Sequence, residues 1–519
     1  MSSTSPTADG PAGVPARGAS ALAAAHGLVA GLLSVGLATL VAGVQQQVGA
    51  ATGVPAPVAA VSGAFVDRTP PWLKDVAIAA FGTNDKRALL VGVVVVLGIL
   101  CASIGLLART RMRPALVAFS LLGAVGVAAV LSRPDASVAD VVPTVLGTVA
   151  GLWFLSRSSF GGAARGAANP ARRLLLGAAV GGSAAYVGTW LGGDSVEATA
   201  SREALAREPA RATTLEVPAG SDLRVPGAAP FIVPNDDFYR IDTAIVVPRL
   251  TAEDWRLKVT GLVEREVELD WNALQGKPMR EALVTLACVS NEVGGDLIGN
   301  AVWTGWPVRE LLALAGPRPG ADMVLQTSAD GWTCGTPLGA LTDDRNALLA
   351  VRMNGEPLPF EHGFPVRLVV PGLYGYVSAC KWVTELRVTT FAEDVGYWTP
   401  RGWSAEGPVK TSSRIDVPRS GATVAAGRVA VAGVAWAQHH GISSVDVQVD
   451  DGPWGAATLA TDASIDAWRQ WVFQWDAQPG SHTLRVRARD LEGNEQSAVE
   501  RPPAPDGAEG LHTITVRVD

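Results

Sequence analysis

Charged residues are scarce in this 519-residue chain, at 18% of all positions, and the mean hydropathy is +0.23. Ordinary soluble domains carry about 25% charged residues, so part of the chain is expected to lie in a membrane. The net charge of -7 gives no basic footprint for a polyanion, which excludes nucleic acid as a partner.

Cysteine and histidine are also rare, with four and six residues. The cysteines show no CxxC, CxxCH or zinc-ligand spacing, which excludes iron–sulfur, c-type haem and zinc-ribbon sites. Only His26 falls in a long apolar segment, so two histidines are not available there to hold a haem. A disulfide between Cys334 and Cys380 is left open, because spacing alone does not establish one.

Five apolar segments predict a transmembrane domain over residues 21–193, since each is close to the roughly 20 residues that cross a bilayer core. The predicted spans are 22–44, 88–108, 114–131, 138–155 and 174–191. Residues 1–20 are expected to be disordered by composition. Residues 55–81 are interrupted by prolines and charges and are expected to form an interfacial loop.

Two loops, 109–113 and 157–173, carry arginines without acids, so the positive-inside rule places them in the cytoplasm. Counting spans then predicts a multi-pass protein of the cytoplasmic membrane, with everything after residue 191 on the extracytoplasmic side. Arg172-Arg173 immediately before the last span resembles a twin-arginine export signal. The alternative is that these two arginines are ordinary positive-inside residues.

The rest of the chain divides by composition. Residues 194–228 are rich in Ala, Arg, Glu and Pro and predict a linker. Residues 229–412 mix short strand patterns with few helical ones and predict an α+β domain. Residues 413–519 show short alternating strands between turns, which predicts an all-β immunoglobulin-like sandwich.

Strand and helix patterns can be placed within these two domains. Strands are expected at 257–262, 282–287, 323–327, 366–370, 384–389, 428–435, 445–449, 470–475, 482–489 and 511–518, and the clearest helix at 306–314.

One cysteine stands at the end of a strand pattern. The apolar run 282–287 leads directly to Cys288, which is followed by Ser, Asn and a glycine pair. A thiolate held beside such a turn suits a transition-metal ligand or a nucleophile. On spacing alone, a buried structural cysteine is an equal alternative.

The stretch Thr285-Leu-Ala-Cys-Val-Ser-Asn291 resembles the molybdenum-ligand segment of the sulfite oxidase family. Residues 354–372, followed by Lys381-Trp382, resemble that family's second cofactor-binding block, in the matching order. The resemblance covers roughly residue 231 to the C-terminus. It implies a molybdopterin-dependent oxidoreductase domain with a Mo-molybdopterin cofactor, followed by a dimerisation-type domain, which leaves a homodimer open.

The resemblance also implies roles for individual residues. Cys288 would be the metal ligand, and Arg240 would orient the substrate, so these two are the catalytic candidates. His362, Arg367 and Lys381 match the residues that hold the cofactor. The cofactor-binding candidates together are Asn235, Phe238, Tyr239, Arg240, Cys288, Asp330, His362, Arg367 and Lys381.

The sequence departs from the sulfite-oxidising members at the pocket. The arginine expected after the ligand cysteine is replaced by Glu292 and Val293, the expected tyrosine is Val351, and an expected histidine is Asp242. An oxyanion needs paired positive charge. The pocket is therefore expected to be poorly made for sulfite.

The leading hypothesis is a membrane-anchored, extracytoplasmic molybdenum oxidoreductase that transfers an oxygen atom and two electrons between water and a small substrate. A separate protein or a quinone would exchange electrons with it. One alternative is a sulfoxide-type reductase of the same fold, and another is a non-catalytic cofactor-binding or docking module. A transporter or sensor is less favoured, because the predicted spans are nearly free of charged residues.

Overall fold

The computed structural model describes residues 16–48, 50–51, 53–70, 85–133, 136–157, 170–193, 195–208 and 212–519. The chain divides into two compact units, Met1–Val196 and Glu197–Asp519. Residues 1–15 of the predicted disordered lead and residues 71–81 of the predicted interfacial loop lie outside the described residues.

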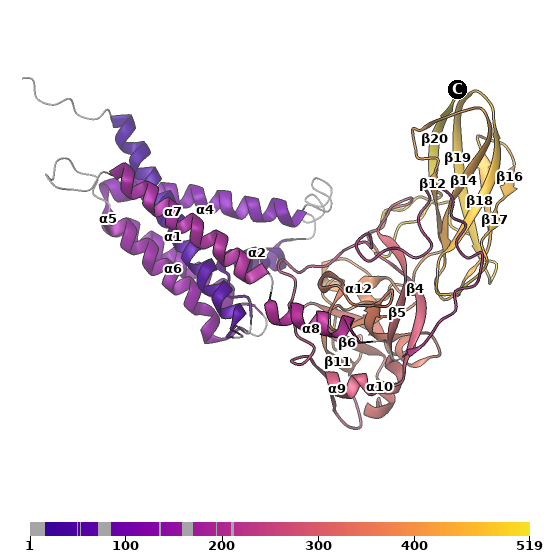
Figure 1. Cartoon of the computed structure of the whole chain (residues 1–519), viewed down its shortest axis with the longest axis horizontal. Coiled ribbons are helices and arrows are strands. Elements are labelled where there is room, and N and C mark those ends of the chain that lie inside the picture. Colours follow the sequence, from indigo (N-terminus) through magenta and orange to yellow (C-terminus); the bar gives the residue numbers. More distant parts are fainter. Residues whose placement is uncertain are drawn as a thin grey trace, which may run out of the picture. The chain divides into compact units, whose positions relative to one another are not determined.

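Within its described residues, the first unit contains five long helices (Figure 1). They are α1 (Ala16–Gln47), α4 (Asp85–Thr110), α5 (Met112–Leu131), α6 (Val138–Ser156) and α7 (Pro170–Gly193), accompanied by the shorter α2 (Pro57–Arg68). All five long helices are long and apolar enough to cross a membrane. The predicted membrane-type helical bundle is therefore confirmed as a fold.

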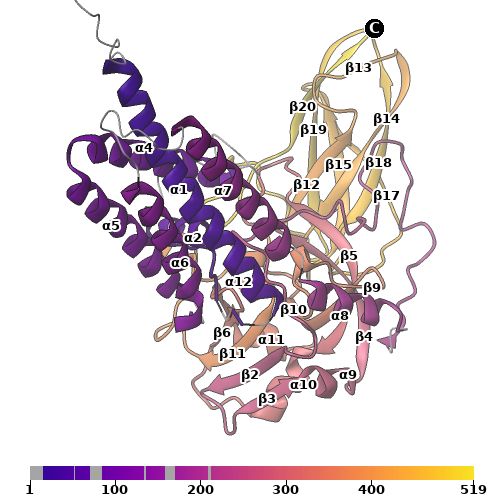
Figure 2. The same ribbon diagram turned by 60° about the vertical axis from the view of Figure 1, so that its left-hand side comes forward.

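Helix α1 packs against α4, α6 and α7, and the turned view shows it between them (Figure 2). Its approach to α7 depends on glycine. A Cβ atom at Gly36 would collide with the carbonyl oxygen of Gly181, and one at Gly43 would meet Gly188. Close crossings at small residues are typical of helices that pack in lipid.

Two sheets form the first part of the second unit. One has the order β1-β4-β5-β8-β10, with β9 on β8, and the other the order β3-β2-β11-β6-β7. The strands of the first are β1 (Ala212–Thr213), β4 (Met279–Ala287), β5 (Ile298–Pro307), β8 (Leu348–Met353), β9 (Glu356–Pro357) and β10 (Arg367–Val369). Those of the second are β2 (Arg256–Gly261), β3 (Val267–Asp270), β6 (Met323–Ser328), β7 (Thr333–Pro337) and β11 (Val383–Thr389).

Short helices connect these strands. They are α9 (Trp271–Gln275), α10 (Val308–Ala315), α11 (Leu338–Thr342), α12 (Gly375–Ser378) and the 3-10 turns η2 (Phe360–His362) and η3 (Thr399–Arg401). The mixed α+β class is confirmed. The predicted helix at 306–314 begins later than expected, because Trp306 and Pro307 still belong to β5.

Residues 194–228 were expected to be a linker, but part of this segment is folded. Helix α8 (Val196–Ala206) buries Ala198 in the core, and the Ser201 hydroxyl donates to the Glu253 carboxylate at 2.8 Å. Strand β1 pairs in parallel with β4. The segment lacks a strong apolar period, but alanine has the highest helix propensity and these few contacts fix it.

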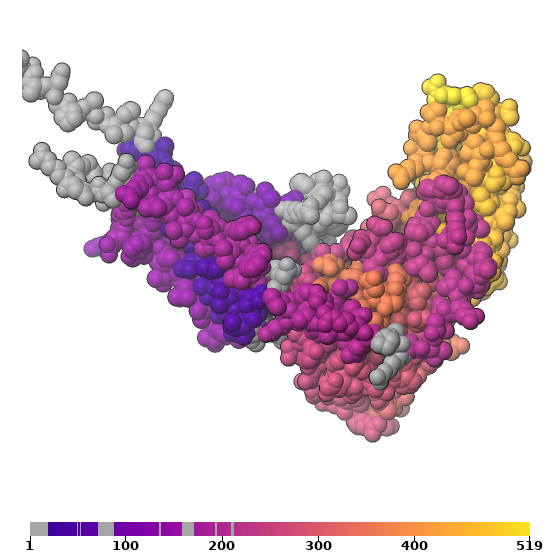
Figure 3. Space-filling view, viewed as in Figure 1, coloured from indigo at the N-terminus to yellow at the C-terminus, as the bar shows by residue number. Residues whose placement is uncertain are grey.

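Residues 214–231 then run along the C-terminal strands, where the magenta surface meets the yellow one (Figure 3). The Leu223 N–H donates to the Gln470 side chain at 2.7 Å, and the Thr461 N–H donates to the Gly220 carbonyl at 3.0 Å. This stretch therefore belongs structurally to the second unit.

The last part of the chain is a sandwich of two sheets, in the orders β12-β14-β18-β17 and β13-β20-β19-β15-β16. Its strands are β12 (Ser412–Val417), β13 (Thr423–Val424), β14 (Gly427–Trp436), β15 (Ile442–Val449), β16 (Trp454–Ala456), β17 (Thr458–Leu459), β18 (Arg469–Ala477), β19 (Gly480–Asp490) and β20 (Thr513–Val518). Val445 and Val447 alternate inward on β15 and are 1% exposed. The predicted immunoglobulin-like sandwich is confirmed.

The sandwich and the α+β part share buried side chains. Val434, Trp436 and Trp468 of the sandwich lie in the same apolar cluster as the residues of β4 and β5. The two parts are thus joined through a continuous core.

Candidate active site

Strand β4 delivers Cys288 to its end. The last six residues of β4 are buried, which fits a continuous apolar run covered on both faces. The Cys288 N–H donates to the Leu297 carbonyl at 2.9 Å, and the Asn291 N–H donates to the Cys288 carbonyl at 3.1 Å. The thiol, on a residue that is 7% exposed, is held by a rigid strand and a tight turn.

Burial raises the pKa of the Cys288 thiol, whereas hydrogen bonds from the backbone and hydroxyl of Ser290 and the charge of Lys381 lower it. A thiol must lose its proton before it binds a metal. The site therefore contains a proton that metal binding would displace, and donors that stabilise the thiolate.

The segment that contains Phe238 and Tyr239 lies beside this thiol. The two rings stack with centroids 5.2 Å apart, and Phe238 meets the rings of Trp303 and His362 edge-on at 5.8 and 5.6 Å. Burial and the neighbouring Cys288 raise the pKa of Tyr239. The phenol is therefore a neutral hydrogen-bond donor.

Arg367 is a buried cation, 4% exposed, at the start of β10. Its guanidinium lies 5.0 Å from the Trp303 ring centre and donates to the carbonyls of His362 at 3.1 Å and Leu368 at 3.3 Å. Burial lowers its pKa to about 10. No acid within the described residues forms an ion pair with it.

Lys381 and Arg240 share a single carboxylate. Oδ2 of Asp242 lies 3.0 Å from Lys381 Nζ and 3.0 Å from Arg240 Nε, and Lys381 also donates to the Glu361 carbonyl at 2.9 Å. The side chains of Asp242 and Lys381 are 7% and 10% exposed, whereas that of Arg240 is 41% exposed. Arg240 is thus the cation of this group that solvent or a small molecule can reach.

Burial, opposed by Asp242, lowers the pKa of Lys381 to about 8. Burial and the charges of Lys381 and Arg367 lower the pKa of His362 to about 3. His362 is therefore a neutral imidazole at physiological pH, while its cationic neighbours keep most or all of their charge.

Of the other two predicted residues, Asn235 contacts the group through a backbone hydrogen bond to His362, whereas Asp330 lies further out. The Asn235 amide donates to the Met353 carbonyl at 3.2 Å and accepts from Asn354 at 2.9 Å, which joins the segment that contains Phe238 to residues 353–354. Asp330 lies in the turn between β6 and β7, where it accepts from the Trp332 N–H at 3.1 Å and raises the pKa of Cys380. The remaining six predicted residues, Phe238, Tyr239, Arg240, His362, Arg367 and Lys381, come together around Cys288.

Sequence reasoning missed two aromatic residues of this site. Trp303 lies under Arg367 and is fully buried on β5, opposite Ala282 of β4. Tyr374 precedes α12, and burial together with nearby Cys288 raises its pKa to about 12. Strand pairing could have suggested Trp303, but Tyr374 stands in a turn that carries no distinguishing pattern.

All four cysteines have free thiols. Cys334 and Cys380 are fully buried neighbours, and burial raises the pKa of both.

The chemistry of these side chains fits a phosphorylated, metal-binding cofactor. Positive charge is concentrated on Arg240, Arg367 and Lys381, with the one carboxylate of Asp242 paired to two of them. A buried guanidinium without a carboxylate partner favours an anionic group. A phosphate tail satisfies that need, and the thiol of Cys288 suits a soft metal.

Comparisons with known proteins agree with this fit. Residues 244–398 match the oxidoreductase molybdopterin binding domain, and residues 412–486 match a bacterial Ig domain. Mitochondrial sulfite oxidase of Homo sapiens is 30% identical over 308 residues, which cover 49% of this chain and 55% of that protein. The chain thus spans about half the length of this relative.

Two further proteins are similar to parts of the chain. Nitrate reductase [NADH] 1 of Nicotiana tabacum is 34% identical over 178 residues, 29% of this chain and 20% of that protein. Among solved structures, the sulfane dehydrogenase SoxCD of Paracoccus pantotrophus is similar with a TM-score of 0.49 and 24% identity, over 61% of this chain and 89% of that one. By the family match, residues 244–398 form an oxidoreductase molybdopterin binding domain, which is similar in sequence to sulfite oxidase and whose cofactor is Mo-molybdopterin.

Proposed function

We propose that this protein is a membrane-anchored molybdenum oxidoreductase that transfers an oxygen atom, with two electrons, between water and a small uncharged substrate. The observation that carries the substrate class is the pairing of Asp242 with both Arg240 and Lys381. One carboxylate reduces the positive charge that an oxyanion such as sulfite would need. A polar but uncharged group is better matched to such a pocket.

Each side chain then has a defined part. Cys288 holds the metal, and Arg367 with Lys381 binds the anionic part of the cofactor, which supplies the centre for oxygen-atom and electron exchange when bound. Arg240, the most accessible cation, orients the substrate through its remaining N–H donors. Tyr239 and His362, both neutral, donate or accept single hydrogen bonds and add no charge.

A sulfoxide-type reductase is the second candidate, because the S=O group is polar and uncharged. A non-catalytic docking module is less well supported, since it would not require the buried thiol and the buried cations to be retained together. Electrons would be exchanged with a separate protein or a quinone, and a homodimer through the sandwich is compatible with both enzymatic candidates.

Molybdenum content tests the proposal most directly. The full chain, purified in detergent from a host that makes molybdopterin, should contain one molybdenum atom per chain by elemental analysis. In the variant Arg367→Met the molybdenum content should be lower by a factor of more than roughly 10, because the anionic part of the cofactor would lose its buried, positively charged partner. The control Arg387→Met removes an exposed arginine of β11, 51% accessible, and should retain the metal. A metal-free wild-type chain from such a host would rule out the enzyme.

The location of the catalytic domain outside the cytoplasm has its own test. Replacing both Arg172 and Arg173 by lysine keeps the positive charge that fixes the topology. If the pair is an export signal, the second unit should remain protected inside spheroplasts treated with protease, whereas the wild-type unit should be digested. If the two residues act only through charge, the lysine variant should behave like the wild type.

A further inference from the structure

The immunoglobulin-like sandwich hydrogen-bonds to strand β4 at Thr285, three positions before Cys288. The Thr285 N–H donates to the backbone carbonyl of Asp466 at 2.9 Å, and the Thr285 hydroxyl accepts from the Trp468 N–H at 2.8 Å. Gln438 donates to the Thr285 carbonyl at 3.2 Å. The sandwich thus satisfies both backbone groups and the hydroxyl oxygen of this one residue.

The same contact reaches the loop that leads to Phe238, Tyr239 and Arg240. The Thr285 hydroxyl donates to Asn300 at 2.9 Å, and the Asn300 amide donates to the Phe231 carbonyl at 2.9 Å. The indole N–H of Trp468 donates to that same carbonyl, also at 2.9 Å. Thr285, Asn300 and Trp468 are 2% exposed or less, so water does not compete for these bonds.

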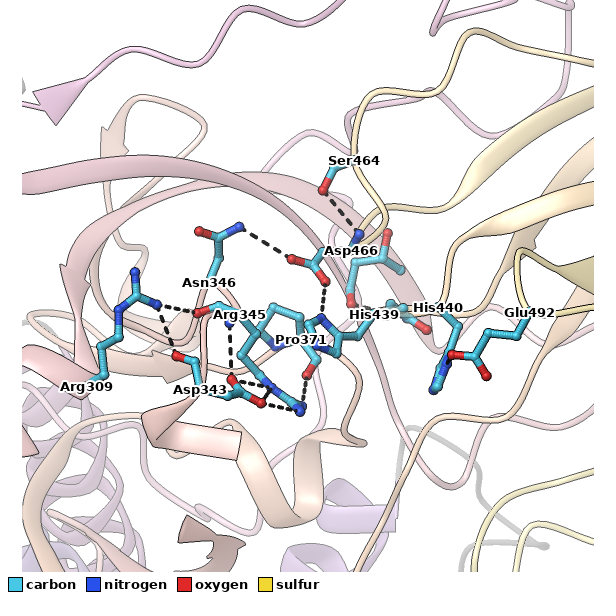
Figure 4. A network of polar contacts seen from close by, with 12 residues as sticks. Arg309, Asp343, Arg345, Asn346, Pro371, His439, His440, Ser464, Asp466 and Glu492 are labelled. Carbon is cyan, nitrogen blue, oxygen red and sulfur yellow. Dashed lines mark hydrogen bonds and ion pairs between the residues drawn. The ribbon is translucent and has the colours of Figure 1, made fainter. Parts of the chain in front are cut away.

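A charged pair fixes the contacting segment of the sandwich. The Asp466 carboxylate accepts a hydrogen bond from Asn346 at 3.4 Å and lies 3.2 Å from His439 Nδ1 (Figure 4). The backbone N–H of Asp466 donates to the Ser464 hydroxyl at 3.1 Å. The His439 N–H donates to the Ile465 carbonyl at 3.0 Å. The Asp466 side chain is 3% exposed, so its charge is poorly solvated and depends on these partners.

We propose that Asp466 and Trp468 are positioning residues for the active site, which hold the Cys288 strand and the Phe238–Arg240 loop in a fixed mutual register through Thr285. Their role is indirect, because their hydrogen bonds reach Thr285 and the Phe231 carbonyl. The role rests on the proposed function for its catalytic consequence, but the mechanical coupling itself is a property of the chain without cofactor.

The first test is amide hydrogen exchange of residues 282–291 in the chain without cofactor. Trp468→Phe keeps the backbone N–H that bonds Thr285 but removes the indole N–H from the Phe231 carbonyl, which weakens the chain of bonds from Phe231 through Asn300 to Thr285, so exchange should accelerate by roughly 10-fold. Trp306→Phe is the matched control, because its indole N–H donates to Glu310 at 2.7 Å, at the opposite end of β5 from Asn300. Thr285→Ser, which keeps the hydroxyl, should retain protection, whereas Thr285→Val should lose it.

A pH profile separates positioning from general packing. Asp466 raises the pKa of His439, with Asp343 acting in the same direction and Arg345 against it. Because the pKa of His439 is higher in the folded protein than its ordinary value of about 6.5, the His439–Asp466 pair stabilises the segment fully when the pH is below that ordinary value. This stabilisation is lost as the pH rises through the pKa of His439 in the folded protein. After correction for intrinsic exchange, the exchange of residues 282–291 in the wild type should therefore become faster as the pH rises over that range. In Asp466→Asn the corrected rate should be independent of pH there. The control is Asp450→Asn, which removes the carboxylate that lies 2.9 Å from His482 Nδ1 elsewhere on the sandwich. This variant should keep the pH profile of the wild type.

The loaded protein supplies the second readout. The Mo(V) resonance should shift in Trp468→Phe and Asp466→Asn but not in the two control variants. If exchange and resonance in these variants match the controls, the positioning role is wrong. If the wild type has no molybdenum, the proposed function fails, and the exchange measurements still decide whether the segment holds β4.

Discussion

Replacing Cys288 by serine is expected to reduce turnover by more than the roughly 10- to 100-fold that changes in outer partners of a metal site cost. Serine keeps the size of the side chain but offers a hard oxygen in place of a soft sulfur. The Mo(V) resonance of the variant should change, because the thiolate is the protein's direct contact with the metal in the proposed site. A turnover assay and paramagnetic resonance of the same sample measure the two effects, and elemental analysis gives the molybdenum content to which both are normalised.

The chain offers a matched control in Cys334→Ser. Cys334 is also a buried free thiol of the α+β part, 1% exposed, but it lies on β7 beside Cys380. This variant should lose stability, because burial of a hydroxyl is costly, and should keep an unchanged Mo(V) resonance. Equal spectra from the wild type and Cys288→Ser would disprove the assignment of Cys288 as the metal ligand.

The second large effect is expected from Asp242→Asn. The change removes one buried negative charge 3.0 Å from both Arg240 and Lys381, while the shape of the side chain is retained. Binding of an oxyanion should strengthen by roughly 10- to 100-fold, given that hydrogen bonds to charged groups contribute about 1.5–3 kcal/mol. Affinity for an uncharged sulfoxide should change much less.

The pH of this experiment matters. The pKa of Lys381 is about 8, and Asp242 is the partner that raises it, so the variant lysine should deprotonate at a lower pH. Inhibition by sulfate and the kcat/KM for sulfite should therefore be measured at least one pH unit below this pKa of about 8, so that Lys381 stays protonated. The control is Asp394→Asn, in which the exposed Arg387 loses the carboxylate that lies 3.1 Å from its Nε. This variant removes one negative charge from the protein at a place away from the pocket. The same sulfate affinity in both variants would refute the idea that Asp242 sets the substrate charge.

The sequence predicted most of the elements that carry strong local patterns. The run before Cys288, the five apolar helices and the alternating strands of the sandwich were all placed correctly, because burial imposes a period on each. Helix α8 was missed, since its mixture of alanine with charged residues has no clear apolar face. A few contacts with the second unit decide its structure instead.

The contacts of Asp466 lay beyond any sequence argument for a different reason. Its carbonyl oxygen, not its side chain, meets Thr285, and every residue type has a carbonyl. The Asp242 pair with Lys381 joins residues 139 positions apart, so only the fold brings their charges together. Local patterns give the candidate residues, whereas the geometry gives their pairing.

The contact between Thr285 and Trp468 also has a consequence for the order of events during synthesis. The two residues are 183 positions apart, and Trp468 lies near the C-terminus. A ribosome must therefore release the first half of the sandwich, up to Trp468, before the Cys288 strand acquires its final partners. Loading of the cofactor into a fully ordered pocket would then follow synthesis of at least the first half of the sandwich, and a chain truncated before Trp468 would emerge with Cys288 present but unsupported.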